Sequence, residues 1–193
     1  MTTVVLGPVR SGKSARAVAL ARATGKPVIV AATAAIDESD SEMMHRVELH
    51  RRARPAEWTV IETGNIDAPP LAAVLCDAPA GTCVIVDALG TWISTQLLRW
   101  GAWCEQEPAS ARERLEAQAH ELAAALAASR ADAIVVAEET GWGLVPPTPL
   151  GRLFRDALGR AVQIIAADAE RVELVVAGYA VDLRRLGERV DVV

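Results

Sequence analysis

The sequence predicts an α/β fold in which a mainly parallel β-sheet lies between two layers of helices. Segments with the pattern of strands alternate with segments that have the pattern of helices along the chain, as in folds built from βαβ units. Most strand segments are rich in valine and isoleucine and lack strict alternation, which is typical of strands buried on both faces. The length of 193 residues corresponds to one domain, residues 1–193, and is sufficient to bury a complete core.

The strands are expected to be short apolar runs. In chain order they are Thr3–Leu6, Val28–Ala32, Thr59–Glu62, Cys83–Asp87, Ala133–Ala137 and Val172–Ala177. The segment from Gly101 to Pro108 is expected to be a surface excursion, and the segment after Gly178 to be only partly ordered.

The helices are expected between these strands. They are Lys13–Ala23, Asp40–Arg52, Pro70–Asp77, Leu89–Trp100, Ala111–Ser129 and Leu150–Asp168. Capping boxes, Ser39 with Glu42 and Ser110 with Glu113, predict the starts of the second and fifth helices. The fifth helix also carries an apolar stripe, which packs either in the core or against another subunit. The stripe consists of Leu115, Leu122 and Leu126.

A glycine-rich loop follows the first strand directly. Its sequence is Gly7-Pro8-Val9-Arg10-Ser11-Gly12-Lys13-Ser14. It fits G-x-x-x-x-G-K-[ST], and the strand before it and the helix after it provide the context that this motif requires. Backbone N–H groups of such a loop close around phosphate oxygens, and the helix N-terminus adds its positive dipole end. Lys13 is expected to reach the β- and γ-phosphates and the Ser14 hydroxyl to ligate Mg²⁺. The sequence therefore predicts a three-layer, P-loop NTPase-type nucleotide-binding domain.

The composition argues against several classes of partner. A net charge of −5 without a basic run disfavours nucleic acid as the main partner, and no apolar stretch reaches the length of a membrane span. The sequence begins with a strand and the phosphate loop, so no signal peptide is expected. Cys76, Cys83 and Cys104 lie outside any C-x-x-C spacing and are expected to be free or buried thiols of a cytoplasmic protein.

An acidic residue beside the metal is the second requirement of such a site. Asp87 ends an apolar strand, and a carboxylate at the carboxyl end of a parallel strand points into the crevice where phosphates bind. We therefore expect Asp87 to hold Mg²⁺, while the alternative role for this residue is a helix N-cap. Glu138 and Glu139 follow the strand Ala133–Ala137, and one of these two glutamates is expected to face the site.

Two histidines and four arginines lie between residues 45 and 54. His45 and His50 point about 140° apart on a helix, at roughly 100° per residue, so they do not form a two-histidine metal site. His50 shares a helix face with Met43 and Val47. An imidazole beside arginines suits a triphosphate, because arginine neutralises phosphate charge and neutral imidazole can attack phosphorus. A structural or solvated histidine fits the same pattern. The arginines are Arg46, Arg51, Arg52 and Arg54.

Blocks along nearly the whole chain resemble one enzyme family. They are Gly7–Ser14, Val30–Thr33, Asp40–Arg46, His50–Trp58 with Glu62, Glu139–Pro146, Phe154–Gln163 and Leu174–Gly178. The two most specific blocks are His50-Arg51-x-x-Arg54-Pro55-x-x-Trp58 and Gly141-Trp142-Gly143-Leu144-Val145-Pro146. With them the chain resembles the bifunctional adenosylcobinamide kinase / adenosylcobinamide-phosphate guanylyltransferase family of cobalamin biosynthesis.

The resemblance implies two reactions of a corrinoid substrate. A nucleoside triphosphate, ATP or GTP, phosphorylates the aminopropanol hydroxyl of adenosylcobinamide. GMP from GTP then passes through an enzyme histidine to adenosylcobinamide phosphate, which gives adenosyl-GDP-cobinamide. The guanylylated histidine corresponds to His50, and Lys13, Arg10 and Mg²⁺ would offset phosphate charge. The remaining nucleotide contacts correspond to Ala32, Thr33, Ala34, Arg51, Arg52, Ala53, Arg54, Glu62 and Asp87. The resemblance also suggests a homotrimer.

Three positions depart from the pattern of this family. Glu138 and Val162 stand where the family often has asparagine, and Gly7-Pro8 stands where Gly-Gly or Gly-Ala often opens the loop. The residues alone indicate a P-loop nucleotide-binding enzyme, so a monofunctional small-molecule P-loop kinase with a structural His50 is the main alternative. A nucleotide-dependent switch is another alternative, but the sequence has no N-K-x-D motif for reading guanine.

Overall fold

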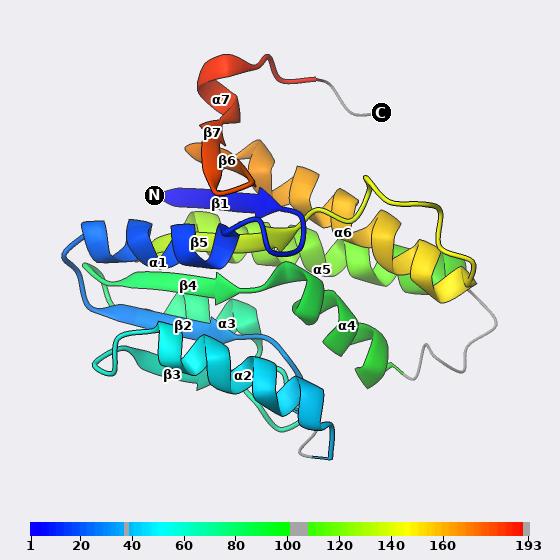
Figure 1. Ribbon diagram of the computed structural model, residues 1–193, viewed down its shortest axis with the longest axis horizontal. Helices are drawn as coiled ribbons and strands as arrows, with labels where there is room; N and C mark the ends of the chain where they lie inside the picture. Colours follow the sequence, from blue (N-terminus) through cyan, green and yellow to red (C-terminus); the bar gives the residue numbers. More distant parts are fainter. Residues whose placement is uncertain (37–38, 101–107, 191–193) are drawn as a thin grey trace.

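Figure 1 shows the fold in a computed structural model, which describes residues 1–36, 39–100 and 108–190. Within these residues, seven strands form one sheet in the order β3-β2-β4-β5-β1-β6-β7. Neighbouring strands are parallel, except that β6 and β7 are antiparallel. The strands are β1 (Thr2–Gly7), β2 (Val28–Ala32), β3 (Thr59–Glu62), β4 (Cys83–Asp87), β5 (Asp132–Glu138), β6 (Arg171–Val176) and β7 (Tyr179–Asp182). The predicted fold class is confirmed, and β1 to β6 agree with the predicted ranges to within one residue at each end.

Helices cover both faces of this sheet. They are α1 (Lys13–Ala23), α2 (Ser41–Ala53), α3 (Leu71–Asp77), α4 (Leu89–Arg99), α5 (Pro108–Ala128), α6 (Pro149–Ala167) and the short α7 (Leu183–Leu186). Figure 1 shows α1 and α2 in front of the sheet and α3, α5 and α6 behind it. No helix in the described part of the chain is long and apolar enough to cross a membrane. Within α2 and α5, the description does not extend to the side chains of Glu42, Met43, Arg46, Leu49, His50, Ala53, Pro108 and Ala109.

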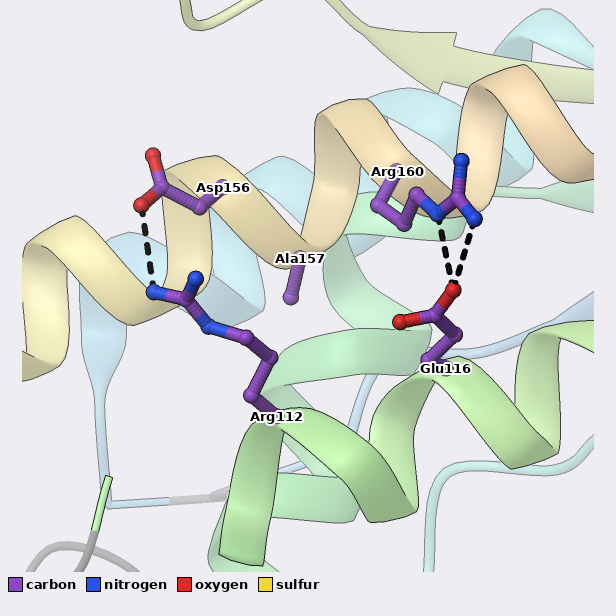
Figure 2. A pocket seen from close by; sticks show the side chains of 5 residues that line it. All are labelled: Arg112, Glu116, Asp156, Ala157 and Arg160. Carbon is purple, nitrogen blue, oxygen red and sulfur yellow. Dashed lines mark hydrogen bonds and ion pairs between the residues drawn. The ribbon is translucent and has the colours of Figure 1, made fainter. Parts of the chain in front are cut away.

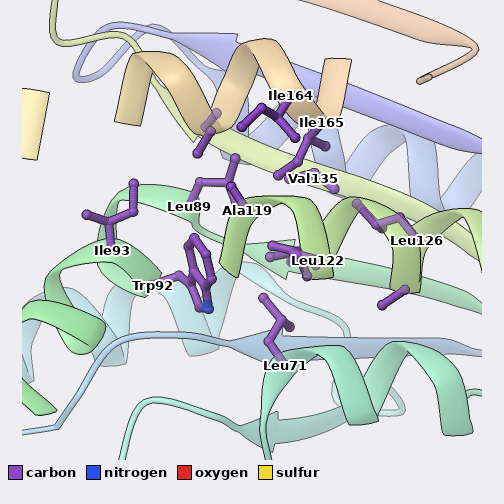
Figure 3. Packing of buried hydrophobic residues seen from close by; sticks show 14 of the residues in the cluster. Leu71, Leu89, Trp92, Ile93, Ala119, Leu122, Leu126, Val135, Ile164 and Ile165 are labelled. Carbon is purple, nitrogen blue, oxygen red and sulfur yellow. The ribbon is translucent and has the colours of Figure 1, made fainter. Parts of the chain in front are cut away.

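The larger part of the core lies between the sheet and the helices α3 to α6 (Figure 3). Leu89 and Ile93 of α4, Leu122 of α5 and Ile165 of α6 are each at most 2% exposed. Full burial of such a side chain stabilises the fold by about 1.5–3 kcal/mol. The other two leucines of the predicted stripe, Leu115 and Leu126, are buried as well. The stripe on α5 is therefore part of the core of the subunit and is not available as a surface for another subunit.

The starts of two helices differ from the predictions, and the segment after Gly178 contains two elements that were not predicted. The fifth helix begins at Pro108, so Ser110 lies in its first turn and is not the N-cap; proline at the first helical position favours this earlier start. The helix α2 begins at Ser41, which places Asp40, and not Ser39, directly before its first turn. After Gly178 the chain forms β7 and α7, up to Leu186. Residues 101–107 of the predicted surface excursion, including Cys104, lie outside the described residues.

A partly buried ion pair joins α1 to β6. The Nε and Nη2 atoms of Arg16 each donate to a different carboxylate oxygen of Glu173 at 2.8 Å. Glu173 is 1% exposed, and its Oε1 atom also lies 2.5 Å from Nη2 of Arg171. The bond to Glu173 raises the pKa of Arg16. Because the phosphate loop lies between β1 and α1, this pair fixes the direction in which α1 leaves the loop.

Candidate nucleotide-binding site

The phosphate loop, residues 7–14, turns tightly between β1 and α1. Gly12 has a φ of 102° and is the N-cap of α1, a left-handed conformation that favours glycine. Gly7 has no room for a side chain, because a Cβ atom there would lie 2.3 Å from the carbonyl oxygen of Val175. Ser11 donates its N–H to Pro8 O at 3.3 Å. Each glycine of the predicted motif is therefore required by the backbone geometry.

The beginning of α1 is open to an anion. No side chain caps this helix and its first turn holds no acidic residue, so the first N–H groups are left for an external acceptor. The Nζ atom of Lys13 lies across the loop, 3.4 Å from Pro8 O. The Oγ atom of Ser11 is buried and has no hydrogen-bond partner among the described residues. These donors fit a phosphate group at the helix N-terminus.

The predicted nucleotide contacts on β2, β3 and β4 lie at one level of the sheet. Ala32 at the end of β2 pairs in register with Glu62 on one side and with Asp87 on the other. Thr33 is 1% exposed, and its Oγ1 atom donates to Ala88 O at 2.6 Å. Ala34, which follows, is half-buried. The backbone N–H of Thr33 donates to Asp87 O at 3.2 Å and its carbonyl accepts the hydroxyl of Thr95 at 3.0 Å. Thr33 thus joins the ends of β2 and β4 to α4 through its side chain and its backbone.

Three arginines at the end of α2 and directly after it have different partners. Arg54 pairs with Asp87 through Nη2 and Oδ2 at 2.6 Å, and both side chains are nearly buried. Arg51 reaches Glu62 at 3.3 Å, whereas Arg52 pairs with Glu48 one turn away on the surface of α2. The N-cap of α4 is Ala88. The alternative role predicted for Asp87, a helix N-cap, is therefore wrong. Of the three arginines, Arg51 and Arg54 connect α2 to the sheet edge and Arg52 does not. Ala53, between them, has its side chain outside the described part.

The two histidines of α2 differ in what the structure describes. His45 is exposed. His50 lies on α2 one turn before Arg54, and its side chain is outside the described residues. The position of the backbone is described, so the ion pair of Arg54 with Asp87 connects the end of the helix that carries His50 to β4. The predicted nucleophile thus belongs to an element that ends at the predicted nucleotide site.

The two glutamates after the fifth predicted strand have different surroundings. Glu138 pairs in register with Gly7 of the phosphate loop, and its Oε2 atom accepts the N–H of Gly90 at 2.8 Å. Burial raises the pKa of Glu138; the Gly90 hydrogen bond and the charge of Lys13 oppose this shift, whereas the charge of Asp87 adds to it. Glu139 instead accepts the N–H of Gly141 at 2.6 Å within its own loop. Glu138 is therefore the glutamate that faces the nucleotide site.

Thr91 and Gly90 also lie in this region, although the sequence pattern did not predict them as site residues. The Oγ1 atom of Thr91 lies 2.5 Å from that of Thr33 and accepts the N–H of Ala88 at 3.1 Å. Threonine at the third position of a helix, directly after the strand that ends at Asp87, is the signal that could have indicated this contact.

The described cysteines are free thiols, and Cys83 is buried. Burial is the main reason that the pKa of Cys83 is raised to about 11, so this thiol is not a nucleophile at neutral pH. Both thiols agree with the prediction.

Among the described residues, no three His, Cys, Asp or Glu side chains gather as a metal site. A magnesium ion would therefore need nucleotide phosphates as additional ligands, which fits its preference for few protein ligands.

Two cavities in the described part of the chain lie away from the phosphate loop. One, of about 290 Å³, lies between α5 and α6 and is lined by Arg112, Glu116, Asp156, Ala157 and Arg160. Figure 2 shows its two ion pairs across the helices, Arg112 with Asp156 at 3.5 Å and Arg160 with Glu116 at 2.8 Å. Asp156 and Arg160 belong to a block on which the family resemblance rests, and here they join α6 to α5.

Comparison with known proteins identifies the family. The family of cobinamide kinase / cobinamide phosphate guanyltransferase matches residues 3–183. The chain belongs to this family. It is 37% identical over 185 residues to the bifunctional adenosylcobalamin biosynthesis protein CobP of Pseudomonas aeruginosa, covering 95% of this chain and 98% of the relative. It is 30% identical over 190 residues to the bifunctional adenosylcobalamin biosynthesis protein CobU of Escherichia coli K12, covering 95% of this chain and 100% of the relative.

The cobinamide kinase family thus accounts for the blocks identified in the sequence, and a solved structure supports the fold. An ATPase from the type III secretion system of pathogenic bacteria superimposes with a TM-score of 0.53 at 11% identity, covering 97% of this chain and 58% of the other. At this identity the likeness concerns the fold alone. It agrees with the predicted P-loop NTPase-type architecture.

Proposed function

We propose that this protein phosphorylates adenosylcobinamide with a nucleoside triphosphate and then transfers GMP from GTP to the product through His50. The observation that carries this proposal is the Arg54–Asp87 ion pair. It joins the end of the His50 helix to a strand end at the same edge of the sheet as the phosphate loop. Membership of the cobinamide kinase / cobinamide phosphate guanyltransferase family, over residues 3–183, supports both reactions.

In the kinase step, the phosphate loop holds the triphosphate. Lys13 contacts the β- and γ-phosphates, and Arg10 adds positive charge beside them. Ser14 and Asp87 are the residues that would hold Mg²⁺, which supplies charge neutralisation at the phosphates when bound. The hydroxyl oxygen of adenosylcobinamide forms a bond to the γ-phosphorus, and the bond from that phosphorus to the bridging oxygen breaks. ATP and GTP present the same three phosphates to these residues.

In the guanylyl transfer, the imidazole of His50 is the nucleophile. A neutral ring nitrogen forms a bond to the α-phosphorus of GTP while the bond to pyrophosphate breaks, and adenosylcobinamide phosphate then takes the GMP group. Histidine suits this step because a large fraction is unprotonated near neutral pH, given its reference pKa of about 6.5. A covalent intermediate divides one difficult transfer into two displacements. The α2 helix moves between the two reactions, because they place different phosphorus atoms in line.

The nucleoside of GTP is proposed to lie over the ends of β2, β3 and β4. Ala34 offers backbone groups there, whereas Ala32 O and the backbone of Thr33 are bonded within the protein. Glu62 and Asp87 offer carboxylates that can accept hydrogen bonds from the base or ribose. Arg51 and Arg54 already pair with these two carboxylates. They can therefore exchange a carboxylate partner for phosphate when GTP binds, since both partners form charge-assisted bonds. Arg52 is proposed to join them only if α2 rotates.

The corrinoid is proposed to approach along the loop between β5 and α6. This loop begins at the phosphate loop, where Glu139 donates its N–H to Gly7 O at 2.9 Å. Trp142, Leu144 and Val145 are 62%, 96% and 64% exposed, and neighbouring apolar side chains of this kind suit a large macrocycle.

We further propose a homotrimer and a cytoplasmic location. The exposed apolar residues of β7 and α7 are a candidate subunit contact.

A product assay with a phosphate-loop control tests the proposal. The protein is incubated with adenosylcobinamide, Mg²⁺ and either ATP or GTP. The corrinoid products are then separated and identified by mass spectrometry. The expected product with GTP is adenosyl-GDP-cobinamide, and Lys13→Ala should lower its formation by about 100-fold or more, as loss of a phosphate-stabilising group does. Corrinoid phosphate as the final product with GTP would instead support the alternative, a monofunctional kinase with a structural His50.

A further inference from the structure

Glu138 is a carboxylate at the nucleotide site to which the proposed mechanism assigns no role. It ends β5, the strand that lies between β1 with the phosphate loop and β4 with Asp87. Its register partner on β1 is Gly7, the first residue of the phosphate loop. A side chain at this position lies next to the phosphates that the loop holds, since the carboxyl ends of adjacent parallel strands meet at one edge.

The carboxylate of Glu138 is held in one orientation by the backbone of α4. Its Oε2 atom accepts the N–H of Gly90, in the first turn of that helix, at 2.8 Å. This approach depends on glycine, because a Cβ atom at residue 90 would lie 2.5 Å from Oε2. The positive end of the α4 dipole favours a negative carboxylate here. No hydrogen bond to the other oxygen, Oε1, occurs among the described residues, and the side chain is only partly buried.

We propose that Oε1 of Glu138 accepts the proton of the corrinoid hydroxyl in the kinase step. The inference rests on the proposed kinase function and concerns this chain alone, because the family often has asparagine at this position. The oxygen–hydrogen bond of the hydroxyl breaks and its proton moves to Oε1, while the oxygen forms a bond to the γ-phosphorus. The electron pair of the bond between the γ-phosphorus and the bridging oxygen leaves with the nucleoside diphosphate. Lys13, Asp87 and the Arg54 that pairs with Asp87 are the charged groups around this transfer.

The two proposed reactions make different demands on such a group. The kinase step needs an acceptor for a hydroxyl proton. Attack by a neutral imidazole on GTP needs none, because the nucleophilic nitrogen carries no proton. Removal of the Glu138 carboxylate should therefore slow phosphorylation and leave the guanylylation of the enzyme intact. Loss of general base catalysis typically costs 10²- to 10⁴-fold in rate.

Glu138→Gln is the decisive variant, because it keeps the size and the bond to Gly90 but cannot take a proton. Phosphorylation of adenosylcobinamide by GTP and incorporation of α-labelled GMP into the enzyme are measured on the same preparations. We expect the kinase turnover number to fall by about 100-fold or more and the GMP labelling rate to stay within about twofold. Glu57→Gln is the matched control, since Glu57 is exposed and precedes β3 at the other end of that strand; it should change neither rate.

A second variant moves the carboxylate without removing it. Gly90→Ala forces Glu138 away from its present position and should lower the kinase turnover by about 10- to 100-fold, as expected for a misplaced catalytic group. Kinase turnover of Glu138→Gln within threefold of the parent would overturn the inference. So would an equal loss of both reactions, or recovery of the variant at high Mg²⁺, which would make Glu138 a nucleotide or metal contact. Absence of phosphorylation by the parent protein would overturn the proposed kinase function together with this inference.

Discussion

At the scale of single residues, the site contains a carboxylate that lowers the stability of the fold at neutral pH. Burial raises the pKa of Glu138 above that of a free glutamate, although Gly90 and Lys13 oppose the shift. The folded protein therefore holds this proton at pH values where the unfolded chain, with a pKa of about 4.3, has released it. Between these two pKa values the free energy of unfolding falls as the pH rises.

Glu138→Gln should reverse this loss. The amide has no proton to lose and can still accept the N–H of Gly90, so the variant should equal the parent in stability below about pH 4. It should then become the more stable of the two as the pH rises through the pKa of the folded carboxyl. Urea unfolding at a series of pH values measures this difference. A stability difference that stays the same from pH 4 to pH 8 would contradict the assignment of a raised pKa.

The residues of the phosphate loop could be predicted from the sequence, whereas the partners of the carboxylates could not. Lys13 and Ser14 belong to a motif that is contiguous in sequence. The pairs Arg54–Asp87 and Gly90–Glu138 join residues that are 33 and 48 positions apart. Such contacts depend on the order of the strands, which the alternation of strands and helices leaves open. The choice between Glu138 and Glu139 likewise required the strand register.

At the scale of elements, the end of α2 is joined to the carboxyl ends of two strands. Its described ion pairs to the sheet come from the end of the helix, where Arg51 reaches Glu62 and Arg54 reaches Asp87. Another ion pair among the described residues, Arg52 with Glu48, lies within the helix. The pairs to the sheet lie close to His50 in the sequence, so a change of partner at Arg51 or Arg54 when GTP binds suits the proposed movement of His50 between two phosphorus atoms.

Arg54→Ala should therefore loosen α2. A hydrogen bond to a charged group contributes about 1.5–3 kcal/mol, so amide hydrogen exchange at the end of α2 should become about 10- to 100-fold faster. Mass spectrometry of peptides that cover residues 41–53 measures this rate. Arg52→Ala is the control, because loss of an exposed pair within a helix costs only about 0.3–0.5 kcal/mol. Equal exchange rates in the two variants would show that the bond to Asp87 does not hold the helix.

At the scale of the whole molecule, the sequence predicted the buried strands and the helices that cover them, but not the edge strand β7 or the order of the strands. The buried strands are runs of valine and isoleucine, and the helices between them begin and end near glycine, proline or polar residues, so β1 to β6 and α1 to α6 could be located. The edge strand β7 was missed because it is short and mostly exposed, and exposure removes the apolar pattern on which strand prediction depends. The strand order was likewise beyond the sequence pattern.

The central claim is that one molecule carries a triphosphate site and a histidine that takes GMP from it. The most direct test is to incubate the protein with Mg²⁺ and GTP labelled at the α-phosphate, beside His50→Ala and, as a matched control, His45→Ala. The account predicts an acid-labile, alkali-stable label on the parent protein and on His45→Ala, and none on His50→Ala. A folded parent protein that binds GTP but takes up no label, or a His50→Ala variant labelled as fully as the parent, would contradict it.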